Sequence, residues 1–119
     1  MALKVVGKGV TRVDVLSKVT GQAVFGADVY LPGMLYGKVL RSPLPHALIK
    51  KIDVSRARDL PGVRAVVTGD EFPYLGGEAI KDMPFLARGK VRFAGEPVAA
   101  VAAVDEETAA RAIELIEVE

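Results

Sequence analysis

The fold of this chain is decided by the sequence VRFAGEPVAAVAAV, residues 91–104. Residues 98–104 form an unbroken apolar run, which is too short to cross a bilayer and is typical of a strand buried on both faces. A Gly-Glu-Pro turn at residues 95–97 precedes this run, and three acidic residues, 105–107, follow it. We therefore expect the other strands to be shorter, half-buried and packed around residues 98–104.

The acidic residues begin the clearest helix pattern of the chain, over residues 105–115. Asp105 suits the N-cap, and the two glutamates that follow favour the positive end of the helix dipole. Beyond the helix, residues 117–119 begin a further strand. The apolar face of the helix, at helical spacing, consists of Ala109, Ala112, Ile113 and Ile116.

Weaker patterns occupy the N-terminal third. Residues 1–20 carry scattered apolar residues and predict an extended arm, with a turn near residues 14–18. Residues 22–30 alternate between apolar and polar types, which predicts a strand with one buried face. A Leu-Pro-Gly-Met turn at residues 31–34 should connect it to an antiparallel strand over residues 35–41. The expected buried face of the first strand is formed by Ala23, Phe25, Ala27 and Val29.

Two prolines in residues 42–46 break the pattern, because each proline removes a ladder donor. A strand is expected over residues 47–54, and Ser55 suits the N-cap of a short helix that runs to Leu60. A valine-rich strand should follow at residues 63–68. The inward side chains of the strand before Ser55 are expected to be Leu48, Ile52 and Val54.

The pattern is lost over residues 69–89, which contain four glycines and two prolines. Irregular segments of this length are uncommon inside compact domains and often carry function. A short strand, residues 91–94, then leads into the central run. These elements predict an α+β fold with mixed, mostly antiparallel sheets and two main helices, formed as one domain over residues 1–119.

Composition excludes several classes of function. The chain has 16 basic and 15 acidic residues in 119, so its net charge of +1 argues against a nucleic-acid or membrane-surface binder. It has no cysteine, which excludes disulfides and thiolate-bound zinc or iron–sulfur clusters, and one histidine. Its beginning does not resemble a signal peptide, and no apolar run is long enough to span a bilayer. A cytoplasmic protein is expected.

Candidate chemistry is sparse. Ser42, His46 and Asp53 are the nearest approach to a nucleophile, base and orienting acid, but no strained elbow frames Ser42. We expect the serine and histidine to bond the backbone of the proline-broken strand end instead. Glu96 could be a general base if it were buried; the favoured interpretation is that it accepts backbone N–H bonds or pairs with Arg92.

Other polar clusters also have simple structural interpretations. Four acidic residues of the 69–89 segment lack the alternating spacing of a calcium loop, and neither glycine pair has the spacing of a phosphate loop. A basic cluster lacks interleaved aromatics and is expected to be a solvated face. We assign no catalytic, cofactor-binding or metal-binding residue. The clusters are Asp70, Glu71, Glu78 and Asp82; Gly7-Lys8-Gly9 and Gly76-Gly77; and Lys50, Lys51, Arg56 and Arg58.

Four segments in this order resemble one family. They are residues 14–28 (DVLSKVTGQAVFGAD), 32–47 (PGMLYGKVLRSPLPHA), 53–68 (DVSRARDLPGVRAVVT) and 86–119 (LARGKVRFAGEPVAAVAAVDEETAARAIELIEVE). Together they are similar to the N-terminal domain of the large subunit of molybdenum hydroxylases, the xanthine dehydrogenase and aldehyde oxidase family. The departures are small: Phe25 replaces a common tyrosine, and Pro45 replaces a common alanine.

The resemblance implies an α/β-hammerhead fold and a non-catalytic structural or assembly role. It implies that molybdopterin cytosine dinucleotide and the catalytic residues lie in later domains of a longer chain, with iron–sulfur and FAD subunits as further partners. The subgroup that looks most similar is 4-hydroxybenzoyl-CoA reductase, through residues 18–21, 86–88 and 98–107. The chain also ends without a terminating turn residue, so we expect a fragment whose isolated form is inactive.

Two further hypotheses stay open. The chain could be a stand-alone binding module that uses the 69–89 segment to hold a ligand or a protein. It could also be a small hydrolase that uses Ser42 and His46.

Overall fold

A computed structural model describes residues 4–119, so the first residues of the expected N-terminal arm lie outside the described part. The chain divides into two compact units, Met1–Pro32 and Gly33–Glu119, and each is described by itself. The second unit contains all the strands of the described residues. No helix in the described range is long and apolar enough to span a bilayer.

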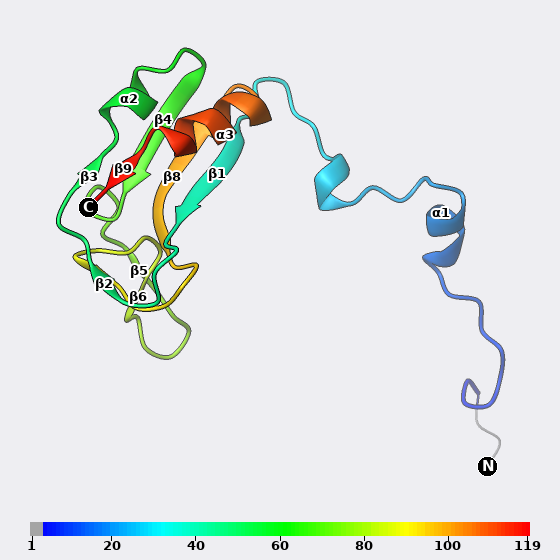
Figure 1. Ribbon diagram of the computed structural model, residues 1–119. Helices are drawn as coiled ribbons and strands as arrows, with labels where there is room; N and C mark the ends of the chain where they lie inside the picture. The colour runs from blue at the N-terminus through cyan, green and yellow to red at the C-terminus, as the bar shows by residue number, and fades with distance from the viewer. Residues whose placement is uncertain (1–3) are drawn as a thin grey trace. The chain divides into compact units, whose positions relative to one another are not determined.

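The predicted central strand is the middle of the main sheet. Strand β8 (Pro97–Ala103) pairs antiparallel with β1 (Tyr36–Arg41) on one edge and with β4 (Val63–Thr68) on the other. Figure 1 shows these three strands side by side, with β8 between β1 and β4, which both precede it in the chain. Its buried positions include residues of both faces, as a continuous apolar run predicts.

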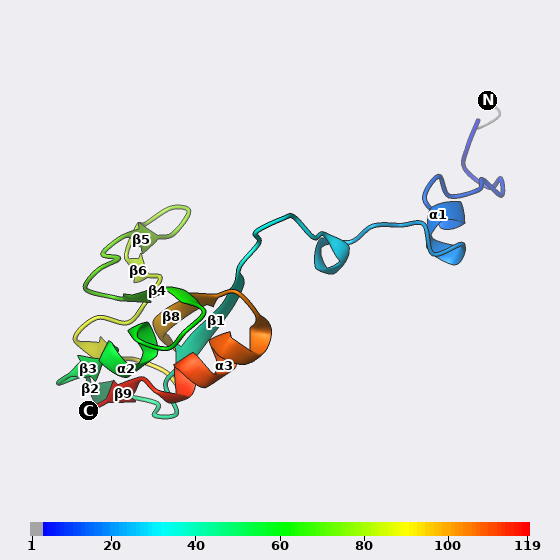
Figure 2. The same cartoon turned by 90° about the horizontal axis from the view of Figure 1, so that it is seen from above.

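Helix α3 (Glu106–Glu114) covers one face of this sheet, together with the short α2 (Ser55–Arg58). Figure 2 shows both helices on one side of the sheet and the β5–β6 pair on the other. Three of the six buried residues at this contact are alanines, whose small side chains permit a close approach of helix and strands. The buried core residues of this layer are Ala57, Val66, Ala99, Val101, Ala112 and Ile116.

Both helix starts are fixed by aspartate side chains. The Asp105 carboxylate accepts the Thr108 N–H at 2.7 Å, which confirms the predicted N-cap. At α2 the prediction was wrong: Val54 occupies the N-cap position and Ser55 is the first helical residue. The Asp53 carboxylate instead accepts the Ser55 N–H at 3.1 Å and the Ser55 hydroxyl at 2.6 Å.

Three small ladders complete the second unit. The last strand of the chain, predicted from residues 117–119, is confirmed as β9 and pairs with β3, antiparallel. The 47–54 strand was expected to be continuous but is divided into β2 and β3, and Leu48 is 73% exposed rather than buried. The ladders are β2 (Ala47–Leu48) with β7 (Lys90–Val91), β3 (Ile52–Asp53) with β9 (Glu117–Val118), and β5 (Leu75–Gly76) with β6 (Met83–Pro84).

The first unit differs from its prediction. Residues 22–30 form no strand; they contain only the short 3-10 helix η1 (Gly26–Asp28), and Phe25 is 57% exposed. Strand β1 therefore pairs with β8 rather than with this segment. A segment with alternating apolar and polar residues forms a strand only where another strand supplies hydrogen-bond partners for its backbone. Residues 22–30 have no such partner among the described strands. The turn expected near residues 14–18 is the helix α1 (Val15–Val19).

The irregular 69–89 segment is partly structural. Besides β5 and β6, it contributes Leu86 and Ala87, which are 7% and 1% exposed. Gly69 is needed where the segment begins, because an added Cβ would lie 2.4 Å from the Ala87 carbonyl oxygen. The segment is therefore anchored in the domain at both ends, at Gly69 where it begins and at Leu86 and Ala87 near its end.

Candidate functional site

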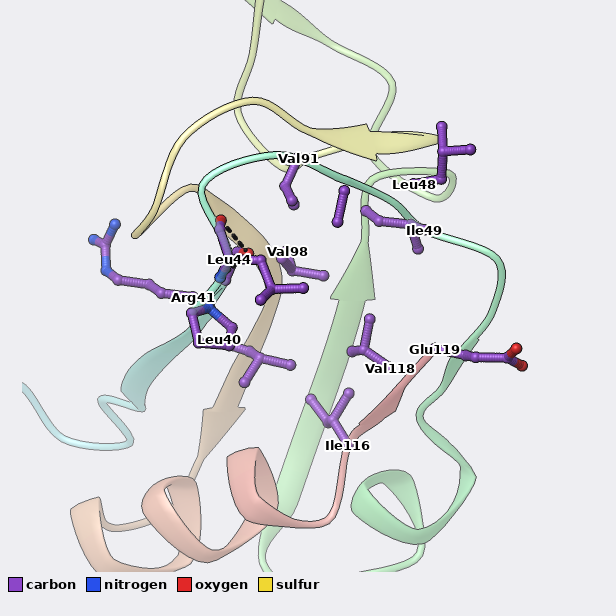
Figure 3. A pocket seen from close by; sticks show the side chains of 13 residues that line it. Leu40, Arg41, Leu44, Leu48, Ile49, Val91, Val98, Ile116, Val118 and Glu119 are labelled. Carbon is purple, nitrogen blue, oxygen red and sulfur yellow. Dashed lines mark hydrogen bonds between the residues drawn. The ribbon is translucent and has the colours of Figure 1, made fainter.

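The second unit contains an open apolar pocket of about 290 Å³. It lies where β1 ends, β2 and β7 pair, and β9 ends the chain (Figure 3). Figure 3 shows Leu40, Val98, Ile116 and Val118 around its interior, while the Arg41 and Glu119 side chains extend away from it. The other lining residues are Ser42, Pro43, Leu44, Ala47, Leu48, Ile49 and Val91.

Ser42 forms part of the pocket wall and is 8% exposed. Its hydroxyl donates to the Leu44 carbonyl at 3.0 Å, and the Leu44 N–H donates to it at 3.1 Å. Its backbone N–H donates to the Glu96 carbonyl at 3.0 Å. These bonds confirm the structural interpretation of Ser42 at the proline-broken strand end.

Glu96 is the one buried carboxylate of the described residues, at 4% exposed. One of its oxygens accepts the Arg92 backbone N–H, and the other accepts from the Arg92 guanidinium at 3.2 Å. Gly95 precedes it with φ of 87°, in the left-handed region that glycine tolerates. Both parts of the favoured interpretation of Glu96, backbone bonding and pairing with Arg92, are confirmed.

The possible triad is not assembled. The hydroxyl of Ser42 is bonded to the Leu44 backbone, and His46 is exposed. Asp53 bonds Ser55 and, at 3.1 Å, the Lys51 ammonium. The Ser55 bonds, and then Lys51, hold the pKa of Asp53 well below its usual range. The expected backbone bond of His46 is not among the bonds of the described residues.

The acidic residues of the 69–89 segment point to different partners. Asp70 accepts from the Arg88 guanidinium at 3.0 Å, and Glu71 accepts from Arg58 and from the Thr68 N–H. Arg58, and then Thr68, lower the pKa of Glu71. Glu78 and Asp82 are exposed. Within residues 4–119, no three metal-ligand side chains gather into one group.

The basic cluster is divided among acidic partners. Lys50 pairs with Glu119 at 3.0 Å and Arg56 pairs with Glu117 at 2.9 Å, while Lys51 pairs with Asp53. These are exposed ion pairs, which are typical of a solvated face. The partners from β9 were not predicted, because only the β3–β9 ladder brings residues 117–119 beside the cluster.

The glycine pairs also have structural roles. Gly76 lies in β5, where an added Cβ would meet the Phe85 ring at 3.0 Å, and one at Gly77 would meet the Ile80 carbonyl at 1.9 Å. Gly7 has φ of 78° in a turn closed by a bond from the Lys8 N–H to the Val5 carbonyl.

The pocket was missed by sequence reasoning. Its apolar residues come from five separate segments, and no single segment shows from its own pattern that the five converge. One signal was present: Leu44 is a large apolar residue between two prolines, outside any predicted strand.

Comparison with known proteins gives consistent matches. A family model described as "Aldehyde oxidase and xanthine dehydrogenase, a/b hammerhead domain" matches residues 20–119. A probable xanthine dehydrogenase subunit of Bacillus subtilis (strain 168) is 48% identical over 110 residues, 91% of this chain and 15% of that protein. The nicotinate dehydrogenase large molybdopterin subunit of Eubacterium barkeri is 42% identical over 118 residues, 98% of this chain and 28% of that protein.

Solved structures agree with this fold. Reconstituted CO dehydrogenase from Oligotropha carboxidovorans aligns with a TM-score of 0.89 and 42% identity, over 95% of this chain and 15% of that chain. Quinoline 2-oxidoreductase from Pseudomonas putida 86 aligns with a TM-score of 0.87 and 38% identity, over 95% of this chain and 16% of that chain. The chain thus spans a minor part of the length of these relatives.

The family model covers most of the chain, and the small antiparallel sheets with few helices agree with its description. The chain therefore belongs to the a/b hammerhead domain family of aldehyde oxidases and xanthine dehydrogenases.

Proposed function

We propose that this chain is a structural and assembly domain within the large subunit of a molybdenum-cofactor-dependent oxidoreductase. The observation that carries the proposal is the open apolar pocket, whose polar neighbours are already bonded within the domain. An apolar surface rimmed by satisfied polar groups favours a packing contact over chemistry. The isolated domain is then expected to be inactive.

The proposal extends to a longer parent protein in which residues 1–119 form one hammerhead domain with an N-terminal arm. The molybdenum-binding domains of the same subunit would be its main partners, with iron–sulfur and FAD subunits as further ones. The molybdenum cofactor, as molybdopterin cytosine dinucleotide, would lie outside this chain. The carboxylates of Asp70, Glu71 and Glu96 are paired with arginine side chains of this domain, which favours a structural role for them over a catalytic one. A cytoplasmic location is part of the proposal.

The substrate of the parent enzyme is a finer proposal. The similarity to the probable xanthine dehydrogenase protein of Bacillus subtilis favours a xanthine-dehydrogenase-like parent. Residues 18–21, 86–88 and 98–107 favour a parent of the 4-hydroxybenzoyl-CoA reductase type. Turnover of xanthine and of 4-hydroxybenzoyl-CoA by the full-length enzyme would distinguish the two.

Metal analysis tests the main proposal. We expect the purified 119-residue chain to contain no stoichiometric molybdenum, and the protein encoded by the complete reading frame, with its partner subunits, to contain it. Stoichiometric molybdenum in the chain alone would contradict the assembly role. A reading frame without molybdenum-binding domains would contradict the parent enzyme.

A stand-alone binding module is the second candidate. The observation that favours it is an exposed aromatic group in the 69–89 segment: the Phe72 and Tyr74 rings lie 4.8 Å apart, and those of Phe72 and Phe85 lie 6.1 Å apart. Such side chains are common in protein interfaces. If this function is correct, Tyr74→Ala should weaken capture of a partner by the 119-residue chain, whereas Leu44→Ala in the pocket should not.

A further inference from the structure

The edge of β2 beside the pocket is open on one side. Strand β2 pairs with β7 alone among the described strands. On the β7 side of this strand, the Ile49 N–H donates to the Gly89 carbonyl at 2.9 Å. The opposite edge of β2 faces the end of β9. There, Leu48 and Ile49 line the pocket together with Val118.

A β-bulge marks the place where β9 reaches this edge. The N–H groups of Lys50 and Lys51 both donate to the Glu119 carbonyl, at 2.7 and 3.4 Å, and the Glu119 N–H donates to the Lys51 carbonyl at 2.9 Å. Two residues of one strand thus oppose one residue of the other. The ladder between β3 and β9 continues past its last strand residues up to Glu119.

Alternation then fixes which backbone groups come next. Consecutive residues of an extended strand direct their N–H and C=O groups to opposite sides. Ile49 bonds toward β7 and Lys50 bonds toward Glu119, so the N–H and C=O of Leu48 point to the Glu119 side. The backbone of Leu48 is therefore the next pairing position for a strand that extends β9.

The same alternation fixes the side chains. Figure 3 shows Val118 directed toward the pocket and Glu119 directed away from it. If β9 is extended, the first and third residues after Glu119 would therefore point into the pocket, beside Ile49. Its volume of about 290 Å³ exceeds that of a cavity of about 150 Å³, which is enough to hold a benzene ring. The site has room for large apolar side chains.

The geometry points to strand addition: the polypeptide that follows Glu119 in the proposed large subunit extends β9, pairs with the Leu48 backbone and closes the pocket with apolar side chains. This inference rests on the proposed function, because it needs a longer chain. Main-chain bonds would give the contact its affinity, and the alternating pocket side chains would give it specificity.

Amide hydrogen exchange on the full-length protein tests this pairing. We expect the Leu48 amide and the Ile49 amide, which is bonded to the Gly89 carbonyl, both to exchange much more slowly than the amide of Glu78 in the exposed segment. A Leu48 amide that exchanges as fast as that of Glu78 would overturn the inference.

A linker variant identifies the occupant. About ten residues after Glu119, the upper range of ordinary strands, are replaced by Gly and Ser in equal number. We expect Leu48 exchange to accelerate at least about tenfold, the equivalent of one lost hydrogen bond, while Ile49 is unchanged. Unchanged Leu48 protection would assign the edge to another segment and overturn the inference.

A point variant serves if the linker protein does not fold. Leu44 lines the pocket and is 54% exposed, whereas Leu75 is 49% exposed in β5, outside this pocket. Leu44→Lys should accelerate Leu48 exchange, and the matched Leu75→Lys should not. Equal effects of the two variants would contradict the role of the pocket.

The two proposals fail in distinguishable ways. A reading frame that ends at Glu119 would overturn both. A molybdenum-loaded full-length protein with a fast Leu48 amide, or with charged residues at both inward positions after Glu119, would overturn strand addition alone. A protected, linker-sensitive Leu48 amide in a full-length protein without molybdenum would support strand addition and overturn the enzyme.

Discussion

At the residue scale, Glu96 joins two strand ends. Its carboxylate bonds both the backbone and the guanidinium of Arg92, while its backbone carbonyl accepts from Ser42. The sequence could predict the first pairing because Arg92 and Glu96 lie on either side of one turn. It could not predict the bond to Ser42, which depends on the β1–β8 register.

Glu96→Ala should destabilise the domain by about 1–3 kcal/mol, because it leaves the Arg92 N–H without its buried acceptor. Glu96→Gln keeps one carbonyl acceptor and should cost less. Urea unfolding of the purified domain measures both. The exposed Glu78→Ala is the control and should change stability by no more than about 0.5 kcal/mol. Equal losses for Glu96→Ala and Glu78→Ala would refute this role.

The ion pair and hydrogen bonds of Glu71 should make the stability of the domain depend on pH. Its pKa is lowered in the folded state by Arg58 and then by the Thr68 N–H, so the folded state holds the proton less tightly than the unfolded state does. Its contribution is therefore present above the ordinary carboxyl pKa of about 4.3 and is lost as pH falls through the lowered folded value.

Thermal unfolding of Glu71→Gln across pH tests this. We expect a lower Tm than that of the wild type at neutral pH and convergence of the two in acid, below the folded pKa of Glu71. The exposed Glu78→Gln should follow the wild-type profile throughout. A Glu71→Gln deficit that stays constant down to acid pH would show that lost packing, not charge, causes it.

At the element scale, the elements with strong local signals were predicted and the pairings between them were not. The apolar run of β8 and the capped, periodic α3 were predicted within a residue or two. The prediction of a strand over residues 22–30 was wrong because an alternating pattern reveals nothing about the second strand that a ladder requires. Leu48 was wrongly placed inside because the bulge at Lys50 and Lys51 interrupts the strand after β2.

The contact between α3 and the sheet depends on small side chains. Ala112 is fully buried, whereas Ala110 on the same helix is exposed. Ala112→Leu should destabilise the domain by about 1–3 kcal/mol through overpacking. Ala110→Leu adds the same atoms at an exposed position and should change stability by no more than about 0.5 kcal/mol. Denaturant midpoints of the two variants would decide it, and similar losses would contradict the close approach.

At the scale of the whole molecule, the family was predicted from four segments together, and the pocket was missed. Each segment carried a local pattern, whereas the pocket exists only after five segments converge. The N-terminal unit has many exposed apolar side chains, among them Val13 at 102% and Val24 at 74%.

The two units predict a pattern of proteolysis. Backbone without strand pairing is cut more readily than a packed core. Brief trypsin treatment of the 119-residue chain should therefore cleave at Lys8, Arg12 or Lys18 before any site in the main sheet. Mass spectrometry of the fragments would identify the sites. Early cleavage at Arg64, within β4, would contradict the expected difference in stability.

The position of β8 between β1 and β4 has a consequence for synthesis on the ribosome. Both outer strands precede it in the chain, so each leaves the exit tunnel before its only partner in the main sheet has emerged. The nascent chain must carry two unpaired strands until residues 97–103 emerge. A pause in translation before Pro97 would prolong that state, and a ribosome-associated chaperone would have its best opportunity to bind there.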